Sequence, residues 1–382
     1  MNRRDLLRQT SAAALGALAA PAALASPASA SPASASPASA SPASVSPASA
    51  PRSAPRRTDG KVLNAYYFRA HMYTCVPAHV RHDMETMAAW GTTHITIAVL
   101  EQDFRAAHHN VDLVCAEAAR VGMKVLAVPS RWCGLFAGAP KVPSEFAAEY
   151  PETWATRNRA GDPLISGPSG PICSVFHPRV RDYLLGLTEE LVTRFDIAGI
   201  VMDEPKKIHR KDYSEHALAA VGADASRLEH VAAKVAFFDE MGRTMKAARP
   251  DATLGLFVHA SKAGDHDDVI DLLAAMPSLD AFGADGRPWD VDATTERNWN
   301  RKCLFPTNVD TFLAAAARHG KRTLVLAENY DLPMRHLDLF DAGMPRLLAL
   351  GLDELLYYYY PRNIEDPEAQ MAVVARHVQQ FA

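Results

Sequence analysis

The sequence has few cysteines, no excess of positive charge and no apolar run long enough to span a bilayer. Its 382 residues include five cysteines, an odd number, and none lies in a Cys-x-x-Cys or Cys/His spacing that would indicate zinc. The formal net charge is −4, and because residues 1–57 carry +5, the rest of the chain carries −9. An acidic body of this kind argues against a nucleic-acid partner.

The first 25 residues have the pattern of an export signal. Arg3 and Arg4 precede an Ala/Leu-rich stretch, residues 11–24, which is too short to cross about 30 Å of hydrocarbon. No cysteine follows the small residues 23–25, so a lipoprotein anchor is not expected either. We predict a twin-arginine signal peptide over residues 1–25, and hence a periplasmic or extracellular protein with no membrane contact after cleavage.

A repetitive segment follows the signal. The unit Ser-Pro-Ala-Ser-Ala recurs through residues 26–50, with one variant that ends in Val45. The repeat offers no large apolar group to bury, and its regular prolines favour an extended chain. We therefore predict a disordered linker over residues 26–60 and a single folded domain over residues 61–382.

Within residues 61–382, short apolar runs alternate with stretches of helical period, which is typical of repeated βα units. Eight strands, each followed by a helix, predict an α/β fold, a single-domain (β/α)8 TIM barrel. The alternative is an open doubly wound sheet, but no glycine-rich phosphate loop follows the first run. The eight runs are residues 63–68, 94–100, 124–128, 197–202, 253–258, 279–283, 323–327 and 355–360.

Carboxylates follow several of these runs, at the barrel end where such enzymes place their sites. Asp203 and Glu204 end the fourth run, Asp285 follows the sixth and Glu328 ends the seventh. Because neighbouring side chains of a strand point to opposite faces, we expect only one of Asp203 and Glu204 to face the barrel axis. The connection 129–177 follows the third run, and its length predicts a functional loop over the same mouth.

Two resemblances rest on these residues. Asp203-Glu204-Pro205 together with Glu328-Asn329 resembles the retaining barrel glycosidases, which implies that Glu204 is the acid/base and Glu328 the nucleophile. The sequence departs from that clan at Asp203, where the clan has Asn.

The second resemblance covers a longer stretch. Residues 173–183 and 195–205 resemble the barrel glycosidases related to alpha-amylases and alpha-galactosidases. By this resemblance, which we favour, Asp203 is the nucleophile and Asp285 the acid. Either pair would suit glycoside hydrolysis, which needs one protonated and one ionised carboxyl group about 5 to 10 Å apart.

Other polar and aromatic groups near the run ends are candidates for binding sugar, because aromatic rings stack on apolar sugar faces. Core packing remains the commoner role for any single aromatic residue. The candidates for substrate binding are Arg69, His71, Tyr73, Trp132, His259, Arg287, Trp289, Tyr330 and Tyr360.

The sequence thus predicts a secreted glycoside hydrolase that acts on an oligo- or polysaccharide without cofactor or metal. One alternative is a catalytically silent carbohydrate-binding barrel. Another is a metal-dependent deacetylase or amidohydrolase using His71, His259 and Asp285, although no His-x-His pair ends the first run. The sugar and the oligomeric state are left open.

Overall fold

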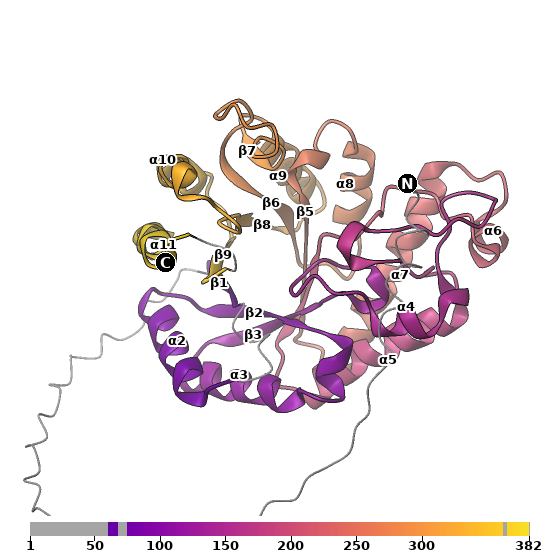
Figure 1. The fold of residues 1–382 in the computed structure, drawn as a ribbon, viewed down its shortest axis with the longest axis horizontal. Helices are drawn as coiled ribbons and strands as arrows, with labels where there is room; N and C mark the ends of the chain where they lie inside the picture. Colours follow the sequence, from indigo (N-terminus) through magenta and orange to yellow (C-terminus); the bar gives the residue numbers. More distant parts are fainter. Residues whose placement is uncertain (1–59, 68–74, 362–364, 382) are drawn as a thin grey trace, which may run out of the picture. The chain divides into compact units, whose positions relative to one another are not determined.

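The apolar runs form a closed barrel of eight parallel strands in the computed structural model, which describes residues 60–67, 75–361 and 365–381. Neighbours follow the order β5-β4-β3-β2-β1-β9-β8-β6, and β6 pairs with β5 to close the ring (Figure 1). The (β/α)8 fold predicted from the sequence is therefore confirmed. The strands are β1 (Val62–Tyr67), β2 (His94–Val99), β3 (Lys124–Pro129), β4 (Gly199–Asp203), β5 (Thr253–His259), β6 (Ala281–Asp290), β7 (Cys303–Phe305), β8 (Arg322–Ala327) and β9 (Glu354–Tyr359).

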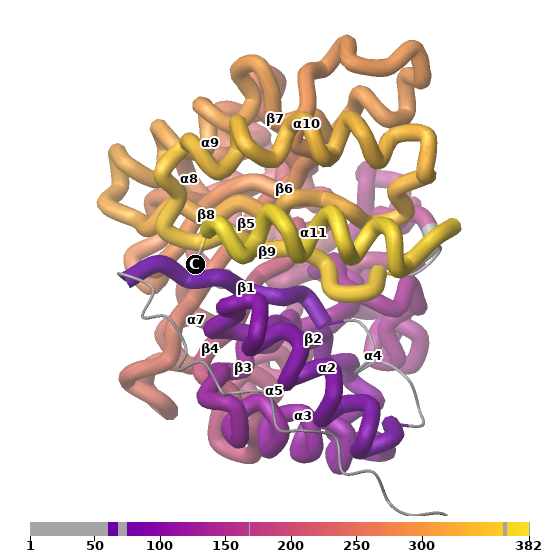
Figure 2. The backbone as a smooth tube through the Cα atoms, turned by 90° about the vertical axis from the view of Figure 1, so that its left-hand side faces the viewer, coloured from indigo at the N-terminus to yellow at the C-terminus, as the bar shows by residue number. Residues whose placement is uncertain are grey.

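Helices cover the outside of the barrel, and α10 and α11 pack side by side on one flank (Figure 2). The residues at the start of α7 form a capping box: the Ser226 hydroxyl accepts a hydrogen bond from the amide of Glu229, and the Glu229 carboxylate accepts one from the amide of Ser226. Gly122 and Gly320, with φ of 80° and 64°, follow the ends of α3 and α9. The helices are α2 (Pro77–Ala89), α3 (His108–Arg120), α4 (Glu145–Glu149), α5 (Pro178–Arg194), α6 (Glu215–Val221), α7 (Arg227–Ala248), α8 (Asp267–Ala274), α9 (Asn308–Arg318), α10 (Leu337–Leu348) and α11 (Pro367–Phe381).

Strand β6 is longer than the sequence predicts. The expected run ends at residue 283, whereas β6 continues to Asp290 because its second half pairs with β7, a short ninth strand outside the ring. Only residues up to Gly286 pair with β8, opposite Ala327, so Asp285 lies inside the strand and still at the mouth. Residues 287–290 extend beyond the ring of eight strands, and β7 pairs with this part of β6.

Alternate residues of the strands fill the barrel interior, as a period of two requires. Near the closed end, Asn64 donates to Glu354 at 3.0 Å and accepts from Thr96 at 2.9 Å. Two residues further along β1 and four further along β9, Tyr66 stacks on Tyr358, with ring centroids 5.2 Å apart. The interior is thus filled by side chains, and open space begins only above the tyrosine layer.

The long connection after β3 folds over the mouth as predicted, with α4 and several short 3-10 turns inside it. Its two cysteines are neighbours, since the amide of Cys173 donates to the carbonyl oxygen of Cys133 at 2.9 Å. Both side chains are buried, as are those of Cys115 and Cys303, and no disulfide joins any of these four cysteines.

The predicted signal peptide and nearly all of the predicted linker, residues 1–59, lie outside the described residues. Across the described ranges, no helix is both long enough and apolar enough to cross a membrane.

Candidate active site

The four predicted carboxylates line one cavity of about 300 Å³ at the C-terminal mouth of the barrel. Asp203 ends β4, Glu204 follows it, Asp285 belongs to β6 and Glu328 follows β8. All four are at least largely buried, so each needs a charged or polar partner to remain ionised.

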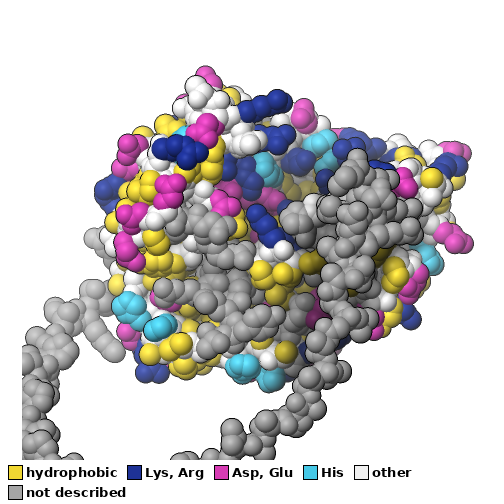
Figure 3. All heavy atoms as spheres, viewed as in Figure 1, with side chains coloured by type: hydrophobic (Ala, Val, Ile, Leu, Met, Phe, Trp, Pro, Cys, Tyr) yellow, Lys and Arg dark blue, Asp and Glu magenta, His cyan; other side chains and the backbone are white. Residues whose placement is uncertain are grey.

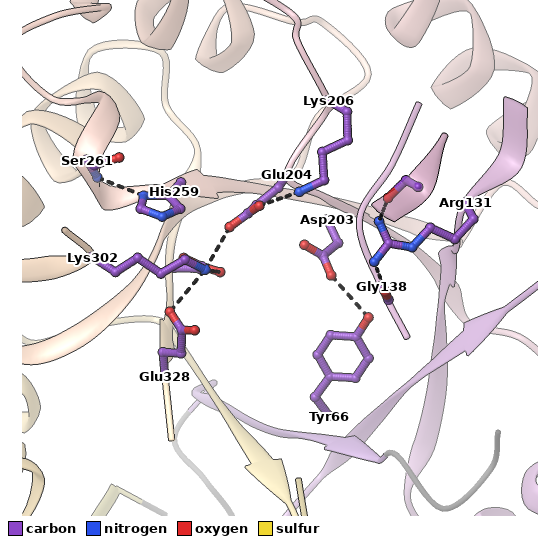
Figure 4. A network of polar contacts seen from close by, with 12 residues as sticks. Tyr66, Arg131, Gly138, Asp203, Glu204, Lys206, His259, Ser261, Lys302 and Glu328 are labelled. Atoms are coloured by element: carbon purple, nitrogen blue, oxygen red, sulfur yellow. Dashed lines mark hydrogen bonds and ion pairs between the residues drawn. The ribbon is translucent and has the colours of Figure 1, made fainter. Parts of the chain in front are cut away.

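Asp203 and Glu204 both face this cavity, which corrects the expectation that only one of them does. Strand alternation fails here because the chain leaves β4 at Glu204 with a φ of 39°, in the left-handed region. The turn brings Glu204 back over the barrel axis, beside Asp203 (Figure 4).

A single ammonium group lies among three of the carboxylates. Lys302, just before β7, places Nζ 3.0 Å from Oε1 of Glu204, 3.0 Å from Oδ2 of Asp285 and 3.1 Å from Oε2 of Glu328 (Figure 4). The attraction of these three carboxylates outweighs desolvation and raises the pKa of Lys302 well above its usual range. Lys302 therefore stays charged and binds three strand ends together.

The pKa values of Glu204 and Asp285 are shifted in opposite directions although both groups are buried. Glu204 also receives Nζ of Lys206 at 2.6 Å, so two ammonium groups hold its pKa well below the usual range despite desolvation. Burial, with repulsion from Glu204 and Glu328, raises the pKa of Asp285 well above its usual range. The proximity of Glu204 thus favours the protonated form of Asp285, whereas the two ammonium groups favour the ionised form of Glu204.

Asp203 contacts the tyrosine layer that lies beneath the cavity. The hydroxyl of Tyr66 donates to Oδ2 of Asp203 at 3.1 Å (Figure 4). Burial and then the charge of Glu204 raise the pKa of Asp203 to about 6. At neutral pH Asp203 is therefore mostly ionised, whereas burial and the neighbouring carboxylates favour the protonated form of Asp285.

The loop after β3 forms the wall beside Asp203. Arg131 donates to the carbonyl oxygen of Gly138 at 2.5 Å and to Oγ of Ser169 at 2.6 Å, which fixes its guanidinium. Gly138 has a φ of 106°, and a Cβ there would lie 2.5 Å from Oγ of Ser130. Only glycine fits this close approach, so the wall has a fixed position.

The predicted substrate-binding residues are divided between the cavity and the core. Tyr330 and Arg287 line the cavity. Trp132 is buried and donates to the carbonyl oxygen of Val99, and Trp289 is also buried. Tyr360 donates to the carboxylate of Glu368, away from the cavity. Arg69, His71 and Tyr73 lie outside the described residues.

His259, at the end of β5, faces an adjoining cavity that Glu204 also lines. Its Nδ1 accepts a hydrogen bond from the amide of Ser261 at 3.1 Å. Burial and the nearby Lys302 lower the pKa of His259 to about 3, so the ring is neutral. Among the residues that the structure describes, no group of three or more His, Cys, Asp or Glu side chains could hold a metal ion.

Sequence reasoning missed the two lysines of the site. Lys206 comes directly after Asp203-Glu204-Pro205, and this proximity was a usable signal. No signal in the sequence marks Lys302, because a lysine 17 positions after Asp285 in a polar segment is typical of a solvent-exposed loop. The pairing of β7 with β6 brings it to the mouth.

Solved structures with the same architecture include the catalytic domain of a beta-amylase from Paenibacillus polymyxa, with a TM-score of 0.56 and 11% identity over 85% of this chain and 99% of that one. An Anoxybacillus alpha-amylase has a TM-score of 0.52 and 14% identity over 85% and 80% of the two chains. The endo-1,4-beta-mannanase of Rhizomucor miehei has a TM-score of 0.52 and 10% identity over 84% and 95%.

No protein-family model matches the sequence, and no curated protein matches it either. At identities of 10 to 14% the structural likeness establishes the architecture alone. The chain therefore has the (β/α)8 barrel fold that the two amylases and the mannanase share.

Proposed function

We propose that the protein is a glycoside hydrolase that cleaves an oligo- or polysaccharide at the barrel mouth. One observation carries the proposal: Asp203 and Asp285 line the same cavity, and the pKa of Asp203 is raised only to about 6, whereas that of Asp285 is raised well above its usual range. Glycoside hydrolysis needs such a pair, because one carboxyl group must donate a proton while the other acts as an anion.

In this mechanism Asp285 is the general acid. It gives its proton to the oxygen of the leaving sugar as the bond between that oxygen and the anomeric carbon breaks. Ionised Asp203 either attacks the anomeric carbon or takes a proton from the water that does so. The hydroxyl of Tyr66, 3.1 Å from Oδ2 of Asp203, keeps this carboxylate oriented.

Glu204 suits a supporting role better than an acid role. Lys206 and Lys302 hold it ionised, so it has no proton to give to a leaving group at neutral pH. Its negative charge helps to keep the proton on Asp285 until substrate arrives. The Asp203/Asp285 assignment is therefore favoured over the Glu204/Glu328 assignment.

The comparisons agree with this proposal at the level of chemistry. The beta-amylase, the alpha-amylase and the mannanase named above are carbohydrate-cleaving enzymes with the same barrel fold. We further propose that the protein reaches its polysaccharide outside the cytoplasm, exported by the twin-arginine signal of residues 1–25.

The test is hydrolysis of a panel of aryl glycosides and polysaccharides by the purified mature protein. We expect Asp203→Asn and Asp285→Asn each to lower the rate by roughly 10² to 10⁴-fold or more, since each removes one half of the acid/base pair. The loss of rate in Asp285→Asn should be smallest on aryl glycosides whose leaving groups need no protonation.

A matched control is Glu354→Gln, which alters a buried carboxylate at the closed end of the barrel, where Glu354 accepts from Asn64. This variant should keep the wild-type rate. Full activity in well-folded Asp203→Asn and Asp285→Asn would refute the assignment. Sugar binding without any hydrolysis would instead identify a silent carbohydrate-binding barrel.

A further inference from the structure

Two further cavities adjoin the candidate active site. The first, of about 400 Å³, is lined by Glu204 and Lys206, which also line the catalytic cavity. The second, of about 730 Å³, shares Lys207, His209 and His266 with the first. Together they form a continuous path from the carboxylates outward, which we call the basic groove.

The basic groove collects cations from segments that are distant in the sequence. Lys207 and Arg210 follow β4, Lys262 follows β5, Arg301 precedes β7 and Arg157 belongs to the loop after β3. Side chains of Lys, Arg and His surround a hollow beside α8 in the face that Figure 3 shows. A fixed set of positive groups at this place is therefore a product of the fold.

Most of these cations have no counter-charge. Arg157 pairs with Asp162, but no carboxylate of the described residues lies within 4.0 Å of Lys207, Arg210, Lys262 or Arg301. The absence of ion-pair partners is unusual here, because the sequence outside residues 1–57 carries a net charge of −9. Lys206 and Arg227, which also line these cavities, pair with Glu204 and Asp268. Glu204 and Asp265 act on Lys262 only from a longer distance, so the groove keeps positive groups without a direct partner.

The cations of the basic groove also repel one another. His209 stacks on His266 with ring centroids 4.5 Å apart, and burial together with the nearby Lys262 lowers the pKa of His209 to about 3. Burial and the neighbouring Lys207 lower the pKa of Lys262 as well. Repulsion between unpaired like charges destabilises the folded protein, and a bound anionic ligand would offset this repulsion.

We propose that the basic groove binds anionic groups of the substrate, so that the protein cleaves a polysaccharide bearing carboxylate or sulfate groups. This inference rests on the proposed function, because the groove starts at the carboxylates that would cut the chain. The cleaved bond lies in the catalytic cavity, and the sugar units on one side of it extend along Lys207, Lys262 and Arg210.

A polysaccharide fits the groove better than a nucleic acid does. Single-stranded nucleic acids are held by rows of aromatic side chains, whereas Tyr213 is the one aromatic side chain other than histidine that the described residues contribute to these two cavities. A glycan can place its anions in the groove and a hydroxyl-rich unit between the carboxylates.

The test compares polymers that differ only in charge. Binding of the full-length mature protein is measured by titration calorimetry with polygalacturonate against its fully methyl-esterified form, and with dextran sulfate against dextran. We expect binding to the anionic members alone, weakening as salt rises, because salt screens partly exposed charges. Comparing polygalacturonate with dextran sulfate shows whether the groove prefers carboxylate or sulfate groups.

The test variant combines Lys207→Asn, Arg210→Gln and Lys262→Gln, with Asn at position 207 because it tolerates the φ of 52° there. We expect it to lose about tenfold or more in affinity for the anionic polymer. The control removes three charges remote from the groove, by Lys124→Gln, Arg318→Gln and Arg376→Gln, and should bind like the wild type. Circular dichroism checks the fold of both.

The two proposals fail separately. Anionic binding that depends on the groove but comes without any hydrolysis would sustain this inference and refute the glycosidase. Hydrolysis of a neutral glycan at the same rate in the wild type and the groove variant would overturn this inference and leave the glycosidase intact. Equal affinity of the two polymers in each pair, or binding of a single-stranded oligonucleotide in preference to every polysaccharide, would also overturn it.

Discussion

Replacing Lys302 by Met should destabilise the protein strongly near neutral pH and much less in acid. The ammonium group of Lys302 is bonded to Glu204, Asp285 and Glu328 at 3.0 to 3.1 Å, and only 21% of its side chain is exposed. The methionine would leave these buried carboxylates without their shared counter-charge. Such a change costs about 3 to 5 kcal/mol of unfolding free energy, or roughly 4 to 8 °C in Tm for a barrel of this length.

The dependence on pH follows from Glu204. In the wild type its folded-state pKa is depressed, so its contribution to stability is complete above the unfolded value of about 4.5 and is lost as the pH falls through the folded value. Without Lys302 the folded-state pKa of Glu204 rises. The deficit of Lys302→Met is therefore full at pH 7.5 and shrinks as the carboxylates take up protons near pH 4.

The assay is chemical unfolding of both proteins at pH 7.5 and pH 4, followed by circular dichroism. Lys246→Met is the matched control, because Lys246 makes one ion pair, 2.7 Å from Asp280, that is partly exposed. Its loss should cost about 1 kcal/mol or less. A deficit for Lys302→Met that equals the control, or one that does not change with pH, would refute the reasoning about the buried cluster.

Three other predictions concern the carboxylates and the N-terminal segment. The acid limb of the rate profile should lie near pH 6, the pKa of Asp203, and Glu204→Gln should move it to lower pH by removing a repelling charge; an unmoved limb would contradict this. Replacing Arg3 and Arg4 by Lys should retain the protein in the cytoplasm, as cell fractionation would show, and unchanged export would rule out the twin-arginine route. Deleting residues 26–57 should leave Tm and activity unchanged, whereas a large fall in Tm on calorimetry would mean that the repeat packs on the barrel.

The strands and the positions of the carboxylates could be predicted from the sequence because both depend on local patterns. Each of the eight apolar runs forms a barrel strand, since a strand covered on both faces needs a short continuous apolar run. Asp203 and Asp285 follow such runs, so the barrel topology alone brings them to one mouth. Neither conclusion requires knowledge of contacts between distant residues.

The charges around those carboxylates were decided only by the tertiary structure. Lys302 reaches Asp285 because β7 pairs with the extended end of β6, and Glu204 turns into the cavity because of one backbone angle. The basic groove likewise joins loops that follow different strands. Electrostatic interactions act through space, over distances that sequence separation does not reveal, so the chemistry of this site depends on packing that local patterns do not encode.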